Sequence, residues 1–255
     1  MHIELLGLPG AGKSTLIRIF LKNYRLSGYA AWDDESALFV SLRNSGFSFL
    51  KILPRNLGVI VVQLIFYHTK LKDSCLDAFI KKNTHLLKLI LNVLHRSACS
   101  DKDKELTLNR FYNLFAKNEQ IRTYFNKNEI VIYDEGFSQR IVSLFGYGFK
   151  NANEKDIIHY ISKIPMPDQV FIIDTEIDKC LKRMENRGYP KRLRNKSENE
   201  ILDTLSVCKK CIDYAANYFK SLGVQVCYID NNRQLKDSYQ DIARIFNAAR
   251  DKPTS

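Results

Sequence analysis

The stretch Gly7-Leu-Pro-Gly-Ala-Gly-Lys13-Ser14 decides the fold, because its glycines, lysine and hydroxyl have the spacing of a phosphate-binding loop. Before it, residues 2–7 predict a short β-strand; after it, apolar side chains at helical spacing over residues 13–24 predict a helix. Glycine lets the backbone curl so that its N–H groups point at a phosphate, and the helix N-terminus adds about half a positive charge. The stretch therefore predicts a nucleoside triphosphate site, and the alternative is a glycine turn without a ligand.

Each group of this loop has an expected role. Lys13 is expected to reach the β- and γ-phosphates, and the Ser14 hydroxyl is expected to ligate Mg²⁺. The other contacts are expected from the loop backbone and the first helical turn, so the full set is Gly7, Leu8, Pro9, Gly10, Ala11, Gly12, Lys13, Ser14 and Thr15.

Acidic residues follow two of the predicted strands. Residues 129–133 predict a strand ending in Asp134 and Glu135, and residues 169–173 predict one ending in Asp174. Because ligands bind at the carboxyl ends of parallel strands, we expect Asp134 to hold Mg²⁺ directly or through water. Glu135 is interpreted as a general base or a second polar contact; the alternative is a carboxylate that only favours a helix N-terminus. Asp174 is interpreted as an ordinary turn residue.

Arginines gather near residue 190. Arg183 and Arg187 are four residues apart and therefore share one helix face, which Gly188 ends, and a basic loop with Arg192 and Arg194 follows. Guanidinium groups stabilise the charge on a transferring phosphoryl group and stack on purine rings. The alternative is a solvated basic helix face.

Predicted strands and helices alternate at both ends of the chain, with a mostly helical stretch between them at about residues 38–126, in which residues 71–96 form one long segment at helical spacing. This order predicts an α/β fold with a parallel sheet. A length of 255 residues fits one domain over 1–255 with a helical insertion at 38–126.

Composition limits the class of protein. Hydrophobic residues make up 45% and charged residues 26%, which excludes a disordered chain. A formal charge of +11 favours anionic partners but does not choose among nucleotides, phosphorylated metabolites, nucleic acid and acidic membrane. The longest apolar run, residues 59–67, is shorter than the roughly 20 residues that span a membrane, and no leader segment is recognised, so we expect a cytoplasmic protein without a membrane partner. Its six cysteines are then expected to be free thiols.

The order of phosphate-binding loop, acidic strand end, R-x-x-x-R-G helix, basic loop, long helix, short strand and final helix resembles the thymidylate kinase group of P-loop kinases, and more broadly the nucleoside and nucleotide kinases. The resemblance covers the first 24 residues and about 129–248. It implies a three-layer P-loop NTPase sandwich with a five-stranded parallel sheet, ATP and Mg²⁺ as cofactors, and helices on the acceptor side. It also implies an arginine-rich lid at 183–200, with roles for Arg183, Arg187, Arg192 and Arg194, and it is compatible with a homodimer. Asn231 and Asn232, in the turn after the last strand, would lie near the adenine.

The acceptor side departs from that family. Asp134-Glu135-Gly136-Phe137 replaces the family's Asp-Arg-Tyr/His motif, and the nearest arginine is Arg140. Residues 28–32 predict a second strand that ends in an acidic turn at residues 33–36, and residues 32–35 stand where that family has an Arg-Glu-Pro segment. The resemblance to deoxynucleoside kinases makes Glu35, or else Asp33 or Asp34, a candidate to accept the proton of a substrate hydroxyl; the alternative is an acidic surface turn. Two early arginines of the insertion are candidates to meet an anionic acceptor, and they are Arg43 and Arg55.

These patterns favour ATP-dependent phosphoryl transfer to a small molecule, which is a nucleoside, a nucleotide or another metabolite. A nucleic-acid 5′-end kinase or a nucleic-acid-stimulated ATPase is a second hypothesis supported by the net charge, although no nucleic-acid module is recognised. A third hypothesis is a regulatory nucleotide switch, but a guanine-reading N/TKxD motif is not found.

Overall fold

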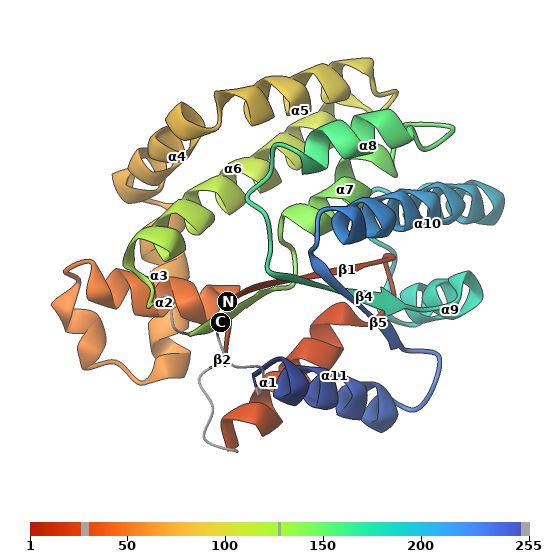
Figure 1. Ribbon diagram of the computed structural model, residues 1–255. Coiled ribbons are helices and arrows are strands. Elements are labelled where there is room, and N and C mark those ends of the chain that lie inside the picture. Colours follow the sequence, from red (N-terminus) through yellow and green to blue (C-terminus); the bar gives the residue numbers. More distant parts are fainter. Residues whose placement is uncertain (27–30, 127–128, 251–255) are drawn as a thin grey trace.

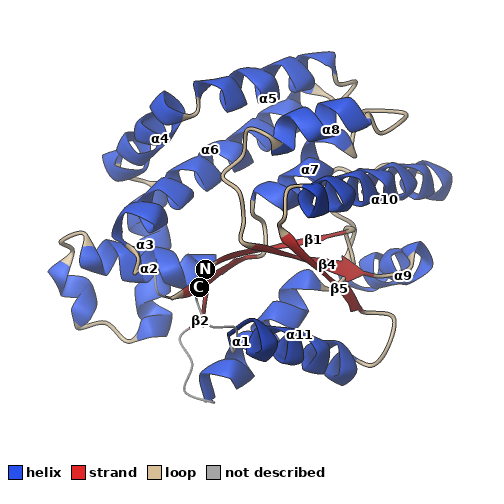
Figure 2. Cartoon of the chain, viewed as in Figure 1, coloured by secondary structure: helices blue, strands red, loops and turns tan. Residues whose placement is uncertain are grey.

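The computed structural model describes residues 1–26, 31–126 and 129–250, except for the side chains of 24–26, 48, 55–56 and 246–250. Within these residues, five parallel strands form one sheet in the order β2-β3-β1-β4-β5 (Figures 1 and 2). The strands are β1 (His2–Gly7), β2 (Ala31–Asp33), β3 (Ile130–Tyr133), β4 (Gln169–Asp174) and β5 (Gln225–Asp230). The expected α/β fold with a five-stranded parallel sheet is confirmed. The start of the predicted second strand, residues 28–30, lies outside the described residues.

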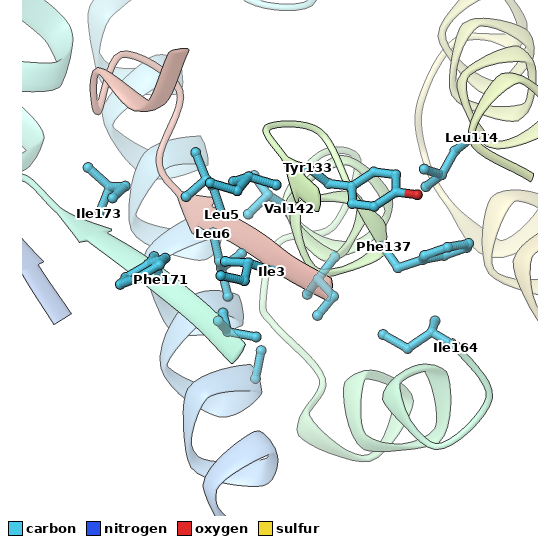
Figure 3. Close-up of a cluster of buried hydrophobic side chains, with 14 of the residues drawn as sticks. Ile3, Leu5, Leu6, Leu114, Tyr133, Phe137, Val142, Ile164, Phe171 and Ile173 are labelled. Carbon is cyan, nitrogen blue, oxygen red and sulfur yellow. The ribbon is translucent and has the colours of Figure 1, made fainter. Parts of the chain in front are cut away.

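The central strand β1 is buried on both faces. Ile3, Leu5 and Leu6 are almost fully enclosed, and Figure 3 shows them in one cluster of buried side chains with Phe171 of β4 and Val142. A nearly continuous apolar strand is what a parallel sheet with both faces covered requires. β1 therefore places the loop that follows it at the middle of the carboxyl edge of the sheet.

Helices cover both faces of the sheet and make the three layers (Figure 1). On one face of the sheet α1 packs against α11. On the other face α7 packs against β1 and against α10, and α10 also packs against α8. The helices of these layers and of the segment between β4 and α10 are α1 (Lys13–Leu26), α7 (Phe137–Phe145), α8 (Glu154–Ile161), α9 (Ile177–Arg187), α10 (Glu198–Ser221) and α11 (Leu235–Arg250).

The insertion between β2 and β3 is helical, as expected. Its elements are α2 (Asp34–Asn44), the 3-10 turn η1 (Ser48–Lys51), α3 (Arg55–Tyr67), α4 (Lys70–Lys82), α5 (Thr84–Arg96) and α6 (Asp101–Tyr124). The central helix α6 packs against α2, α4 and α7, so it joins the insertion to the sheet layers.

Two local expectations in the insertion are corrected. The acidic residues 33–36 do not form a free turn, because the Asp33 side chain accepts a hydrogen bond from the Ser36 amide at 2.8 Å and caps α2. The segment 71–96 is not one helix. Asn83 has φ −129°, outside the helical range, and its side chain donates to the Phe79 carbonyl at 2.9 Å, so α4 ends there and α5 begins.

No helix of the described part of the chain combines the length and the apolarity needed to cross a membrane. All six cysteines are free thiols, and Cys208 and Cys211 are both buried in α10.

Candidate nucleotide-binding and acceptor site

The loop between β1 and α1 turns through two glycines in the left-handed region, Gly10 with φ +84° and Gly12 with φ +89°. A side chain at Gly12 would come within 2.7 Å of the Asn231 side-chain nitrogen. The Arg183 guanidinium donates to the Ala11 carbonyl at 3.1 Å, and the Asn231 side chain donates to the same oxygen at 2.6 Å. α9 and the turn after β5 therefore hold the loop in its curled conformation.

Lys13 begins α1 and is buried. Its ammonium donates to the carbonyl oxygens of Gly7 at 3.0 Å and Leu8 at 3.2 Å. Burial lowers the pKa of Lys13, against the opposing attraction of Glu135 and Asp134. The loop therefore encloses a cation whose hydrogen bonds go to backbone oxygens.

Ser14 and Asp134 meet at the carboxyl edge of the sheet. The Ser14 hydroxyl donates to Asp134 Oδ2, and the other carboxylate oxygen, Oδ1, is buried without a partner among the described residues. Burial raises the pKa of Asp134, although the Ser14 hydrogen bond and the charge of Lys13 oppose the change.

The donors at this point suit a hard cation. A hydroxyl and a carboxylate are oxygen ligands, which Mg²⁺ prefers together with phosphate oxygens and water. The described residues hold no group of three or more His, Cys, Asp or Glu side chains that could bind a metal. Because Mg²⁺ takes only one or two ligands from such a protein site, Ser14 and Asp134 fit it.

A cleft of about 360 Å³, here called the loop cleft, opens in front of the loop. Gln139 of α7 lines it and accepts a hydrogen bond from the Gly7 amide at 3.0 Å, which ties the loop to α7. Besides residues 9–15 and Gln139, polar or aromatic side chains line the cleft, and they are Arg110, Glu135, Arg140, Ser143, Tyr147 and Arg187.

A second hollow of about 130 Å³, here called the side chamber, is lined by Arg110, Asn113, Leu114, Lys117, Glu135 and Arg140. Three of these residues, Arg110, Glu135 and Arg140, also line the loop cleft. Glu135 is exposed and pairs with Arg140 Nη2 at 3.1 Å, whereas Arg140 itself is buried. The two hollows therefore meet at the ion pair of Glu135 and Arg140.

The acidic residues after β2 are already paired. Lys117 of α6 donates to Asp34 and, at 2.9 Å, to Glu35, whose second oxygen accepts from Gln63 at 3.3 Å. Burial alone would lower the pKa of Lys117, but the nearby Asp34, Tyr67 and Glu35 outweigh it and raise that pKa. Asp33 serves as the cap of α2, and none of Asp33, Asp34 and Glu35 lines the loop cleft or the side chamber.

The arginines of 183–200 lie in different settings. Arg187 lines the loop cleft. The side chain of Arg192 is 6% exposed, lies over the Tyr147 ring at 4.9 Å and donates to the carbonyls of Ser143 at 2.8 Å and Asp103 at 2.7 Å. It therefore anchors the basic loop to α6 and α7, while Arg194 donates to the nearby Tyr189 carbonyl at 3.0 Å.

Among the described side chains, Arg43 and Asn232 line neither the loop cleft nor the side chamber. The guanidinium of Arg43 lies 5.9 Å from the Phe39 ring, and the side chain of Arg55 lies outside the described part. Asn232 accepts a hydrogen bond from the Glu176 amide at 2.9 Å and so fixes the turn after β5 to the start of α9.

Sequence reasoning missed the contribution of α6. Arg110, Asn113 and Lys117 are spaced so that they share one helix face, and all three line the side chamber. A polar stripe beside buried aromatic residues of the same helix, such as Phe111 and Phe115, is the signal that could have found them.

No family model matches the chain, and no curated protein matches it. Among the solved structures that match are three of deoxyadenosine kinase from M. mycoides, each covering 97% of this chain and 100% of that protein. One has the products dCMP and a flexible dCDP bound, at 16% identity and a TM-score of 0.48. The others have bound dATP, at 16% identity and 0.47, and bound dCTP, at 15% identity and 0.47.

Proposed function

We propose that the chain binds ATP with Mg²⁺ on residues 7–15 and transfers the γ-phosphoryl group to a small-molecule acceptor. The observation that carries this proposal is the hydrogen bond from Ser14 to Asp134, formed beside the enclosed Lys13 at the N-terminus of α1. Backbone N–H groups, a cation and an oxygen pair at one helix N-terminus suit a triphosphate better than any neutral ligand.

Ser14 and Asp134 would hold the metal. When bound there, Mg²⁺ neutralises charge that develops on the phosphate oxygens. Lys13 would exchange its bonds to the Gly7 and Leu8 carbonyls for phosphate oxygens, because an ammonium gains more from an anion than from a neutral carbonyl.

In the transfer, the bond from the γ-phosphorus to the β-phosphate oxygen breaks as a bond to the acceptor oxygen forms, and ADP leaves. A hydroxyl acceptor also loses a proton, which a carboxylate takes up. Glu135 is the better candidate, because it lines both hollows, whereas Glu35 lines neither and is held by Lys117 and Gln63.

The segment 183–200 would cover the triphosphate and exclude water, which would otherwise take the phosphoryl group. Arg187 is the arginine of this segment that lines the loop cleft, so we assign it the contact with the transferring group. Arg183 and Arg192 would act as positioning residues, since their guanidinium groups hold the loop and the helices around it.

The test is ADP release in Mg²⁺ and ATP against nucleosides, nucleotides, sugars and 5′-hydroxyl oligonucleotides. Turnover that depends on a small acceptor, that Lys13→Ala abolishes and that Lys22→Ala retains supports the proposal; Lys22 is an exposed lysine of the same helix. Turnover unaffected by any acceptor contradicts it and indicates a switch, and turnover only with oligonucleotides indicates a nucleic-acid kinase.

A further inference from the structure

α3 contains the longest apolar run of the chain, residues 59–67, but only one of its sides is buried. On that side Gly58, Val62 and Phe66 are enclosed and lie one turn apart. Gly58 meets the Phe39 ring of α2 so closely that an added Cβ would overlap it. A helix that is apolar on all sides is normally buried on all sides, so the other side of α3 needs an explanation.

The other side of α3 is apolar and exposed. Leu57, Ile60 and Leu64, here called the α3 face, have the i, i+3, i+7 spacing of one helix face and are 55%, 56% and 60% exposed. Ile52, in the turn that leads into α3, is 86% exposed. No residue of the α3 face lines the loop cleft or the side chamber, so a ligand in either hollow leaves the face open. Apolar side chains gathered in this way mark a surface that meets a protein or a membrane.

The segment around the α3 face is positively charged. Residues 43–72 include five basic residues and no Asp or Glu. Two of the five are exposed lysines close to the ends of α3 along the chain, because Lys51 comes just before the turn and Lys70 begins α4. The acids that flank the segment are Glu35, which pairs with Lys117, and Asp73 on α4. The apolar face therefore lies within a stretch of positive charge.

This charge argues against a second copy of the chain as the partner. In a dimer with two-fold symmetry, the same patch of both copies meets. The basic residues of 43–72 would then face those of the other copy, and like charges repel. An anionic lipid surface instead offers acyl chains to the apolar side chains and phosphate groups to the lysines.

We propose that α3 lies flat on an anionic membrane surface, with Leu57, Ile60 and Leu64 among the acyl chains and Lys51 and Lys70 at the headgroups. Lysine suits this place because its aliphatic stem follows apolar surface while its ammonium stays at the headgroup level. The expectation of a protein without a membrane partner considered only a spanning segment, and a helix that lies in the interface needs no such length. This contact does not depend on the proposed phosphoryl transfer.

The location of α3 leaves the loop cleft free. Figure 1 shows α3 and α9 at opposite sides of the molecule. Arg187, at the end of α9, lines the loop cleft, so a membrane on the α3 face does not cover this part of the cleft. Binding to a membrane and binding of a nucleotide are therefore compatible.

The first experiment measures co-sedimentation with vesicles of phosphatidylcholine alone and of phosphatidylcholine with about one third phosphatidylserine, an anionic lipid. We expect binding at least about 10-fold tighter to the anionic vesicles, and weaker as salt is added. Leu64→Gln and Ile60→Gln should each weaken it about 10-fold, because the apolar contact is lost. Lys70→Gln should weaken it about 5-fold. The matched controls Leu91→Gln and Lys88→Gln, at exposed positions of α5, should bind as tightly as the unmodified chain.

The second experiment measures the molecular mass in solution, without lipid, by light scattering for the unmodified chain and Leu64→Gln. We expect equal masses and equal melting temperatures, since the substituted side chain is exposed. A dimer that Leu64→Gln dissociates overturns the proposal and identifies the α3 face as an interface between copies. Absence of vesicle binding, equal binding to both kinds of vesicle, or binding that neither Leu64→Gln nor Lys70→Gln weakens also overturns it.

Discussion

The Ser14 hydroxyl donates a hydrogen bond to Asp134 across 120 positions of sequence, joining the start of α1 to the end of β3. The two residues meet because β1 and β3 are parallel neighbours whose carboxyl ends share one edge of the sheet. The metal site that we propose is therefore a consequence of strand order.

Asp134→Asn tests that site. The amide oxygen can still accept from Ser14, but it carries no charge, so we expect the Mg²⁺ concentration for half-maximal nucleotide binding to rise about 10- to 100-fold. Because burial raises the pKa of Asp134, the neutral side chain removes a cost to folding, and the melting temperature should not fall.

The matched control is Asp174→Asn, at the end of β4 on the other side of β1, where the carboxylate pairs with Lys209 at 2.9 Å. It should leave the Mg²⁺ dependence unchanged. If nucleotide binding depended equally on Mg²⁺ in Asp134→Asn and in the unmodified chain, Asp134 would not be a ligand of the metal.

Glu4 is a buried acid that holds the acceptor-side helix. It lies at the centre of β1, is 0% exposed, and accepts hydrogen bonds from the backbone amides of Phe137, at 3.1 Å, and Ser138 at the start of α7. Burial alone would raise the pKa of Glu4, but the hydrogen bond and charge of His2 and the hydrogen bonds from Ser138 outweigh it and lower that pKa. α7 carries Gln139 and Arg140, so Glu4 helps to position these two cleft residues by fixing the start of their helix.

Glu4→Gln should lower the free energy of unfolding by about 2 kcal/mol at pH 7, the worth of hydrogen bonds to a charged group. A carboxyl whose pKa is lower in the folded state contributes stability above its unfolded pKa of about 4.3 and loses it as the pH falls through the folded value. The difference between Glu4→Gln and the unmodified chain in urea unfolding should therefore shrink below about pH 4. A difference that stays constant from pH 7 to pH 3, or equals that of the exposed Glu105→Gln, would show that the charge is not responsible.

Gly10→Ala tests how tightly the loop packs on α9. Gly10 has φ +84°, and an added Cβ would lie 2.5 Å from the backbone oxygen of Cys180. Gly223 has φ +80° with nothing within 4 Å of an added Cβ, so Gly223→Ala isolates the backbone strain of about 1–2 kcal/mol.

Gly10→Ala should lower the free energy of unfolding in urea by more than Gly223→Ala, because backbone must move as well, and it should weaken nucleotide binding. An equal loss of unfolding free energy in both variants would contradict this expectation, because it would show that the loop can move away from α9 at no cost.

The sheet could be predicted from the sequence because each strand is a short apolar run next to a turn or an acidic residue. β1, β3 and β4 lie within a residue or two of the predicted ranges, and their parallel direction follows from alternation with helices. Prediction was less accurate where one segment fits two local structures. The acidic residues 33–36 look like a turn, yet Asp33 caps α2.

The loop side of the site could also be located from the sequence, since the motif is contiguous. The acceptor side could not, because its contacts join distant segments. Lys117 reaches Asp34 from 83 positions away, and Arg192 donates to the Ser143 carbonyl 49 positions away. Spacing along one segment says nothing about partners on another helix, so the contacts of Arg192 with α6 and α7 could not be predicted.

The most direct test of the account is calorimetric titration of a non-hydrolysable ATP analogue with and without Mg²⁺ into the unmodified chain and Lys13→Ala. We expect binding that strengthens with Mg²⁺ and weakens at least about 100-fold in Lys13→Ala, since one buried donor to a phosphate is lost. Heat that is absent with every nucleoside triphosphate plus Mg²⁺, or equal in Lys13→Ala, would contradict the claim that residues 7–15 bind the triphosphate.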